Sequence, residues 1–293
     1  MKKKLNIITG ICLFFTGILV AQSPVNGFMQ KPGEGAVVLS YSQESYDEVF
    51  LVPEEVDGVP IFNDVTISSI SLFGDIGVTD NLTVSLNVPY IESQGSATQA
   101  TLDNNGFENE RSGVQNLKVY AKYRFHSFSL GESTLDLIGA VGLETPLGDY
   151  RADEGLQSII AIGNEASSFN TFGIAHFKTQ SGIFATGQAG YSFRGNDVPH
   201  ALVTELKLGY AASKYYFDVF IANQLSEDGV DILGEGFTGF FPATEVNYTR
   251  IGINGYAPLY DGIGITAGAN AYVAGRNLGK STGFYGGLVY SFN

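Results

Sequence analysis

The sequence predicts an all-β protein: a transmembrane, antiparallel, up-and-down β-barrel of about twelve strands, with ten or fourteen strands also compatible. Three observations lead to this fold class. Most of the chain consists of runs of roughly 9 to 15 residues in which apolar and polar side chains alternate. Long and short connections between these runs alternate as well. Charged residues make up only 16% of the 293 residues, yet just one long apolar stretch exists, which argues against a helical membrane protein.

The first 21 residues have the pattern of a secretory signal peptide. Three lysines, Lys2–Lys4, precede an apolar run that ends at Ala21. Cleavage there would leave a short N-terminal segment, residues 22–34, in the periplasm or the lumen, followed by the barrel, residues 35–293. The exported chain would carry 13 basic against 30 acidic side chains, a formal charge of −17, and no cysteine. A retained membrane anchor is the alternative interpretation of the apolar run.

The strand pattern is clearest in Leu117–Phe125. Odd positions of this run are apolar, whereas Lys118, Lys122 and Arg124 occupy even positions, so one face of the strand is apolar and the other is charged. Similar alternation occurs in residues 82–90, 135–143, 202–210, 215–221 and 284–292. A soluble two-sheet sandwich would alternate in the same way, so this pattern alone leaves both folds open.

The connections favour the barrel. We expect long loops after odd-numbered strands, at residues 47–63, 91–111, 145–165, 195–200, 226–243 and 275–281. Short turns are expected after even-numbered strands, at residues 79–81, 126–133, 179–182, 212–214 and 258–261. Long loops at one rim and tight turns at the other are typical of outer-membrane barrels. If the last strand ends in the periplasm, the long loops face outside the cell.

The four longest loops are strongly acidic. They hold 17 of the 30 acidic residues and only two arginines. We expect an outer rim that meets outer-membrane lipid and lipopolysaccharide, and whose carboxylates could bind divalent cations; a merely solvated surface is the alternative. Asp103–Glu110 only faintly resembles a calcium loop, because its ligand spacing is wrong. The acidity argues against nucleic acid as a partner.

Composition and motifs give no indication of catalysis. The exported chain has no cysteine and only three histidines, His126, His176 and His200, so thiolate and His-rich metal sites are not expected. No nucleophile elbow, phosphate-binding loop or metalloprotease helix is present. The sequence therefore predicts no enzyme, no metal site and no cofactor.

Charged residues on the polar side of the predicted strands define a candidate lumen. We expect ten of them to line it: Lys118, Lys122, Arg124, Asp136, Glu144, Arg194, Glu205, Lys207, Asp218 and Arg250. Together with Glu44 and Asp75 they comprise six bases and six acids, which predicts no net ion selectivity. Two interpretations stay open. The charges either orient a solute in a polar lumen or form cross-strand ion pairs that fill and stiffen a narrow barrel.

One tract of the sequence carries a family resemblance. Ser112–Phe125 and then Gly139–Asp149 resemble the outer-membrane transporters named for the meta-pathway of phenol degradation, relatives of the fatty-acid and toluene channels. Members have a Ser-Gly-x-Gly-Asp stretch before a strand with Lys-Tyr, and then a Pro-Thr-Gly-Asp-like turn. Here Gln115–Asn116 replaces Gly-Asp, and Leu147 replaces the Thr.

The resemblance implies a barrel of about twelve strands in the outer membrane of a Gram-negative bacterium. Such a barrel would pass small, often hydrophobic or aromatic, solutes inward. The larger fatty-acid channels carry an N-terminal plug. In this chain only residues 22–34 precede the first strand, so at most a short segment could enter the lumen.

Three functions are compatible with these patterns. The first is a porin-like channel for passive uptake of small solutes. The second is a structural or surface-binding barrel with a closed lumen and acidic extracellular loops. The third is an outer-membrane lipid hydrolase, which needs a serine and a histidine at one rim; His200, with Ser192 on the preceding strand, is the candidate pair, although a surface histidine at a strand end is the ordinary interpretation.

Overall fold

The structure, a computed structural model, describes residues 25–52, 55–212 and 215–293. The predicted signal peptide, residues 1–21, lies outside this part of the chain. Among the described residues, no helix is long and apolar enough to cross a membrane.

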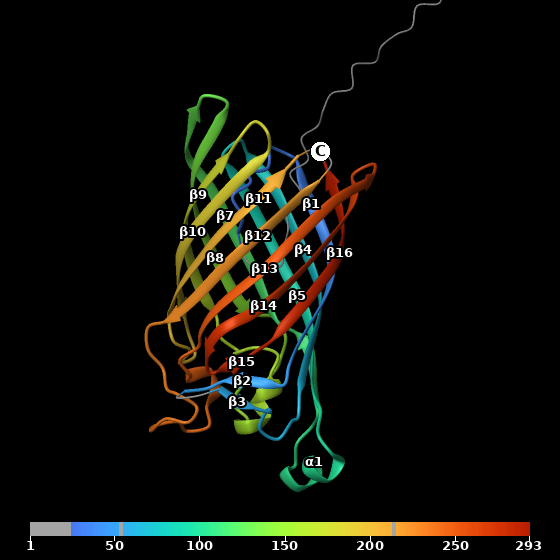
Figure 1. Cartoon of the computed structure of the whole chain (residues 1–293), viewed down its shortest axis with the longest axis vertical. Helices are drawn as coiled ribbons and strands as arrows, with labels where there is room; N and C mark the ends of the chain where they lie inside the picture. The colour runs from blue at the N-terminus through green and yellow to red at the C-terminus, as the bar shows by residue number, and fades with distance from the viewer. Residues whose placement is uncertain (1–24, 53–54, 213–214) are drawn as a thin grey trace, which may run out of the picture.

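Twelve antiparallel strands form a closed barrel (Figure 1), which confirms the predicted fold class. They are β1 (Gly35–Tyr46), β4 (Val65–Thr79), β5 (Leu82–Gly95), β7 (Asn116–Leu130), β8 (Ser133–Pro146), β9 (Ser168–Lys178), β10 (Ile183–Arg194), β11 (Ala201–Ala211), β12 (Tyr216–Ser226), β13 (Asn247–Tyr260), β14 (Ile263–Arg276) and β16 (Thr282–Phe292). Each strand pairs with its neighbours in chain order, and the pairing of β1 with β16 closes the sheet.

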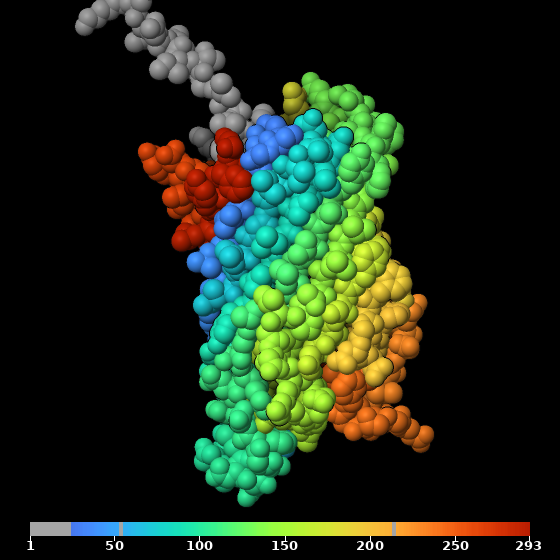
Figure 2. All heavy atoms as spheres, turned by 180° about the vertical axis from the view of Figure 1, so that it is seen from behind, coloured from blue at the N-terminus to red at the C-terminus, as the bar shows by residue number. Residues whose placement is uncertain are grey.

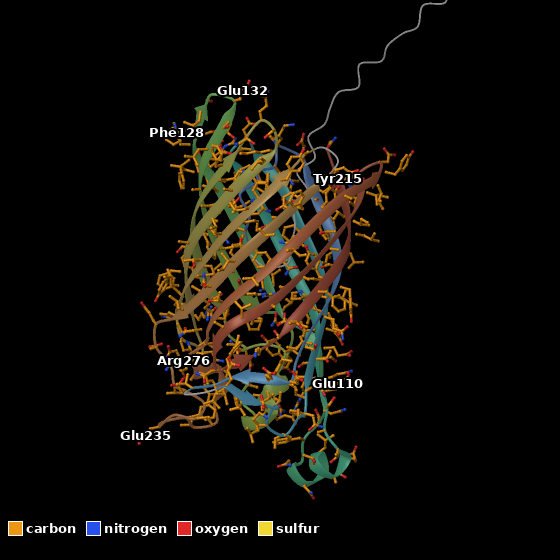
Figure 3. All side chains as sticks on the ribbon, in the orientation of Figure 1. Glu110, Phe128, Glu132, Tyr215, Glu235 and Arg276 are labelled. Carbon is orange, nitrogen blue, oxygen red and sulfur yellow. The ribbon has the colours of Figure 1, made fainter. Side chains whose placement is uncertain are left out.

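Short turns and long loops lie at opposite ends of the barrel, as the spacing predicted (Figure 1). We name these the turn end, which includes the C-terminus, and the loop end. One predicted connection, residues 126–133, was wrong, because β7 and β8 continue to Leu130 and from Ser133. A register shift between Arg124 and His126 inverts the alternation there and hides the rest of the strand. Figure 3 labels Phe128 and Glu132, which lie on this hairpin at the turn end.

The two faces of the wall differ as those of a membrane barrel must. Outward side chains are large, apolar and exposed, as Leu206, Val219 and Ile253 illustrate. Inward neighbours such as Glu205 and Asp218 are polar and buried. Alternation places lipid-facing and lumen-facing residues on opposite sides of every strand, so a strongly apolar exterior is stable only in lipid.

The long loops contain structure of their own. β2 (Glu48–Phe50), β3 (Glu55–Asp57) and β15 (Leu278–Gly279) form a small three-stranded sheet at the loop end. β6 (Glu110–Val114) pairs with the end of β5. The loop between these two strands projects beyond the barrel (Figure 2) and carries the short helix α1 (Gln99–Asn105).

The alternation pattern did not reveal helix α1. Its ends are set locally, because the hydroxyl of Thr98 accepts a hydrogen bond from the amide of Thr101 and Gly106 adopts a left-handed conformation. Only Leu102 of the helix is buried. It packs with Phe62, Val65 and Ile160, and this apolar cluster joins three of the long loops to the barrel.

Candidate functional site

All ten predicted lumen residues occupy inward positions in the strand register. Cross-strand partners point to the same side of a sheet, and Lys122 stands opposite Thr83 while Lys207 stands opposite Thr186. Each of these four side chains is buried. The sequence pattern thus placed the charges on one face, although it could not say which charges meet.

Four of the bases form ion pairs inside the barrel. Three of these pairs are Lys118 with Glu144 at 3.6 Å, Arg124 with Asp136 at 3.6 Å, and Lys207 with Glu205 at 3.5 Å. The fourth joins Arg250 to Glu44 at 3.7 Å. Asp218 instead accepts hydrogen bonds from the hydroxyl of Tyr216 and from Asn254. These contacts fix much of the inward charge to the wall.

Residues 25–34, here called the plug, fold back from the start of β1 into the turn end of the lumen. Pro32 forms a bridge with Gly77 of the wall, where a side chain would collide with the carbonyl oxygen of Lys31. Phe28 is 6% exposed and lies edge-on to Phe184 and Tyr216, with ring centroids 5.1 and 6.0 Å away. These rings belong to β10 and β12, so the plug reaches across the lumen.

Lys122 holds the plug through its ammonium group. The three N–H bonds of that group match three acceptors: the carbonyl oxygen of Asn26 at 3.1 Å, its Oδ1 at 2.9 Å, and the carbonyl oxygen of Phe28 at 2.6 Å. The side chain is 2% exposed. A buried ammonium without partners would be costly, so this residue and the plug stabilise each other.

Gln30 makes a second connection to the wall. Its side-chain nitrogen donates to both carboxylate oxygens of Asp75, at 3.3 and 3.2 Å. Its backbone amide donates to the hydroxyl of Thr83 at 3.1 Å. Asp75 also accepts a hydrogen bond from the amide of Ala36. The plug is therefore bound to β4, β5 and β7 by polar contacts and to β10 and β12 by aromatic ones.

A chamber of about 510 Å³ occupies the loop end of the lumen. Its floor carries Asn116, Lys118, Glu144, Arg194 and Gln224, which come from β7, β8, β10 and β12. Its roof is built from the loops and is mainly apolar, with Ser158, Asn164 and Asn277 as polar members; the apolar residues include Val49, Leu51, Ile159, Ile232, Phe241 and Leu278. The chamber therefore combines a polar wall with an apolar cover, as small-molecule sites commonly do.

The roof is fastened by polar contacts between loops. The guanidinium of Arg276 donates to both carboxylate oxygens of Asp231, at 2.8 and 2.7 Å, and to Glu245 at 2.9 Å. These hydrogen bonds hold the pKa of Asp231 below its ordinary value. The ammonium of Lys280 joins Glu48 at 2.6 Å and Glu55 at 3.1 Å, which raises the pKa of Lys280.

The candidate hydrolase pair does not assemble. Ser192 is inward and buried, and its hydroxyl accepts a hydrogen bond from Nε of Arg194. The ring of His200 packs against Tyr191 and Phe193, and its Nδ1 accepts a hydrogen bond from the backbone amide of Arg194. Tyr191 and Phe193 alternate with Ser192 along β10, so the histidine and the serine lie on opposite faces of the wall.

The described residues of the acidic loops contain no ready-made metal site. Within the described ranges, no three His, Cys, Asp or Glu side chains are grouped closely enough to hold a metal ion.

Comparison with solved structures places this architecture among outer-membrane β-barrels. An outer membrane channel from Pseudomonas putida F1 matches with a TM-score of 0.70 and 14% identity, over 92% of this chain and 99% of that one. This likeness confirms the fold that the sequence resemblance implied. The translocator domain of the autotransporter NalP from Neisseria meningitidis has a TM-score of 0.47 and 12% identity, over 88% of each chain. No protein-family model matches the sequence, and neither does any curated protein.

Sequence reasoning missed the roof and the anchors of the plug. The roof residues lie in loops without periodicity, and their contacts join segments far apart in the chain. Phe28 and Gln30 sit in a segment with no strand pattern. The available signal for these plug residues was Phe28-Met29-Gln30, where apolar and polar side chains stand close together just before the first strand.

Proposed function

We propose that the chain is an outer-membrane channel for passive passage of small solutes, with its lumen closed at both ends in the resting state. The observation that carries this proposal is the chamber of about 510 Å³ enclosed by a twelve-stranded wall. Inward side chains just fill a barrel of about eight strands, and the interior widens with the number of strands, so a wall of twelve leaves room for a solute. The plug closes the chamber toward the turn end and the loops cover it.

Passage requires both closures to move. The plug is covalently joined to the wall at the start of β1, and its other contacts are non-covalent, so it can leave the lumen without unpairing a barrel strand. We expect hydrophobic or aromatic solutes to be carried, since the roof of the chamber is apolar and the resemblance of Ser112–Phe125 points the same way. Transport down a gradient through such a lumen requires no cofactor and no catalysis.

Conductance in a planar bilayer tests the proposal. Phe28→Ala removes the aromatic centre of the plug, a change that costs roughly 3–5 kcal/mol at a well-packed site. We expect this variant to conduct more than the parent protein. Phe128→Ala, at an exposed phenylalanine on the β7–β8 hairpin outside the lumen, is the matched control and should conduct like the parent.

A closed structural barrel is the competing function, and the inward ion pairs favour it. In that case the parent and Phe28→Ala would both be silent, although heat-modifiable gel migration showed both to be folded. Any steady current that Phe28→Ala raises and Phe128→Ala does not would exclude this alternative.

The proposal includes the cellular setting. The chain is exported by cleavage near Ala21 and inserts in the outer membrane of a Gram-negative bacterium, with the turn end in the periplasm. The acidic loops then face lipopolysaccharide, where divalent cations bridge carboxylates to lipid phosphates. N-terminal sequencing of the protein from purified outer membranes tests the first part: a start near Gln22 supports it, and an intact Met1 contradicts it.

A further inference from the structure

The charge of the chamber differs from that of the chain. Of the described residues that line it, three are charged: Lys118, Glu144 and Arg194. Lys118 and Glu144 form an ion pair, so one positive charge remains in the chamber of a protein whose formal net charge is −14. A net positive charge in a partly apolar enclosure favours a solute of opposite charge.

That charge is the guanidinium of Arg194. Within the described part of the chain, no carboxylate lies within 4.0 Å of it, whereas Arg124, Lys118, Lys207 and Arg250 each have an acidic partner. Removing a cation from water without a counter-charge is costly. The stability of the wall therefore does not explain why the guanidinium of Arg194 lies, without an acidic partner, on the floor of a ligand-sized chamber.

The guanidinium is nevertheless held in place. Its Nε donates to the hydroxyl of Ser192 at 3.1 Å, one terminal nitrogen donates to Oε1 of Gln224 at 2.7 Å, and the other reaches the carbonyl oxygen of Pro199 at 3.5 Å. Gln224 is fixed in turn, because its Nε2 donates to the carbonyl oxygen of Val246 at 2.9 Å. These neighbours orient the planar group before any solute arrives.

The remaining donors define what can bind. A guanidinium has five N–H bonds, and three are used here, so each terminal nitrogen keeps one free. Two N–H bonds on one rigid plane match the two oxygens of a carboxylate. The apolar roof, with Ile159 and Phe241 among its residues, suits a compact hydrocarbon body attached to that carboxylate.

We propose that Arg194 is the carboxylate-binding residue of a solute site in the chamber, and that its solutes are organic carboxylates with a compact apolar body. The inference rests on the proposed channel function and names the solute class for it. Arg194 binds the carboxylate, Gln224 and Ser192 position the guanidinium, and the roof excludes water from the hydrocarbon.

Isothermal titration of the full-length exported protein in detergent micelles tests the site with three probes. 4-Butylbenzoate carries both features, 4-butylbenzyl alcohol lacks the charge, and acetate lacks the apolar body; titration into empty micelles corrects for partition. We expect 4-butylbenzoate to bind more tightly than either of the others. Arg194→Gln should weaken its binding roughly tenfold or more, since a charge-assisted two-pronged pair is lost, and should leave the alcohol unchanged.

Two further variants keep the test decisive. Arg124→Gln removes an inward arginine that is paired with Asp136 and does not line the chamber, so it should bind 4-butylbenzoate like the parent. Arg194→Lys keeps the charge without the planar fork and should bind with intermediate strength, which also serves if Arg194→Gln fails to fold. Equal binding of the benzoate and the alcohol, or equal weakening by Arg194→Gln and Arg124→Gln, would overturn the site.

Conductance of the same preparations separates this inference from the channel itself. Binding that depends on Arg194 in a protein that carries no current would support the site and refute the channel. Current without selective binding would support the channel and refute the site.

Discussion

The two ends of the lumen are closed by different physical means. At the turn end residues 25–30 of the plug are buried or half-buried. Lys122 donates hydrogen bonds to the plug, and Phe28 packs among aromatic rings. At the loop end an apolar cluster holds part of the roof, but polar contacts between its loops are partly exposed ion pairs, since the side chain of Arg276 is 33% and that of Lys280 is 40% exposed. Buried polar networks are costly to disrupt, whereas exposed pairs contribute little. The loop end should therefore open readily and the plug rarely, so the plug limits passage.

Lys122→Met should have the largest effect. It removes the ammonium that donates to the carbonyl oxygens of Asn26 and Phe28, and a buried acceptor left unpaired costs roughly 1–3 kcal/mol. The third acceptor, Oδ1 of Asn26, keeps the backbone amide of Phe28 as a donor. We expect residues 25–34 to exchange amide hydrogen much faster in mass-spectrometric measurements. Lys178→Met is the control, because the ammonium of Lys178 lies over the ring face of Phe28 and makes a cation–π contact with the plug. Slow exchange in both variants would mean that Lys122 does not hold the plug.

Arg276→Gln should have a smaller effect, confined to the roof. It removes the ion pairs with Asp231 and Glu245, and a pair at such partly exposed positions contributes about 0–1 kcal/mol. We expect faster exchange in residues 227–246 and unchanged exchange in the plug. Arg151→Gln, which breaks an exposed pair with Glu154 within one loop, should alter neither region. Faster exchange of the plug in Arg276→Gln would show that the two ends are coupled.

Acid should weaken the same contact. The pKa of Asp231 is lowered by its hydrogen bonds from Arg276, so the contact is fully present above the ordinary value of 3.8 and is lost as the pH falls through the lower value of the folded protein. Exchange in residues 227–246, measured between pH 7 and the acid limit of the folded barrel and divided by the intrinsic amide exchange rate at each pH, should rise only at the acid end. In Asp231→Asn this rise should be absent; a rise near neutral pH would contradict the assignment.

Salt should have the smallest effect, and only on charged solutes. The acidic loops repel an approaching carboxylate, and the Debye length falls from roughly 10 Å at 0.1 M to about 3 Å at 1 M salt. Uptake of 4-butylbenzoate by proteoliposomes should therefore quicken modestly with salt, while uptake of 4-butylbenzyl alcohol stays constant. Equal responses of the two solutes would mean that the rim does not influence entry.

The fold could be predicted from the sequence because a barrel wall obeys a local rule. Alternation in Leu117–Phe125 placed Lys118 and Lys122 on the inward side, and loop lengths gave the two ends. The rule failed where the backbone broke it, at the register shift beside Phe125.

The partners of the lumen charges could not be predicted, because they depend on how tilted strands meet around a closed sheet. Arg250 on β13 reaches Glu44 on β1, a contact that exists only after closure. The chamber was equally hidden. Its roof joins loops that have no periodic pattern. Arg194 became distinctive only once four of the other inward bases were seen to pair with acids and Lys122 to be held by the plug.

Thiol labelling inside the lumen tests most directly whether the lumen is the route of solutes. Ser168 on β9 lines the chamber, and Ser129 is exposed on the β7–β8 hairpin outside it. Ser168→Cys and Ser129→Cys are each built on a chain that begins at Gln22 and so has no other cysteine. Their currents are recorded in a planar bilayer before and after treatment with a bulky methanethiosulfonate. If the lumen conducts, labelling of Ser168→Cys removes most of its current and labelling of Ser129→Cys leaves the current unchanged. Complete labelling of Ser168→Cys without loss of current would contradict the claim that the lumen is the route of solutes.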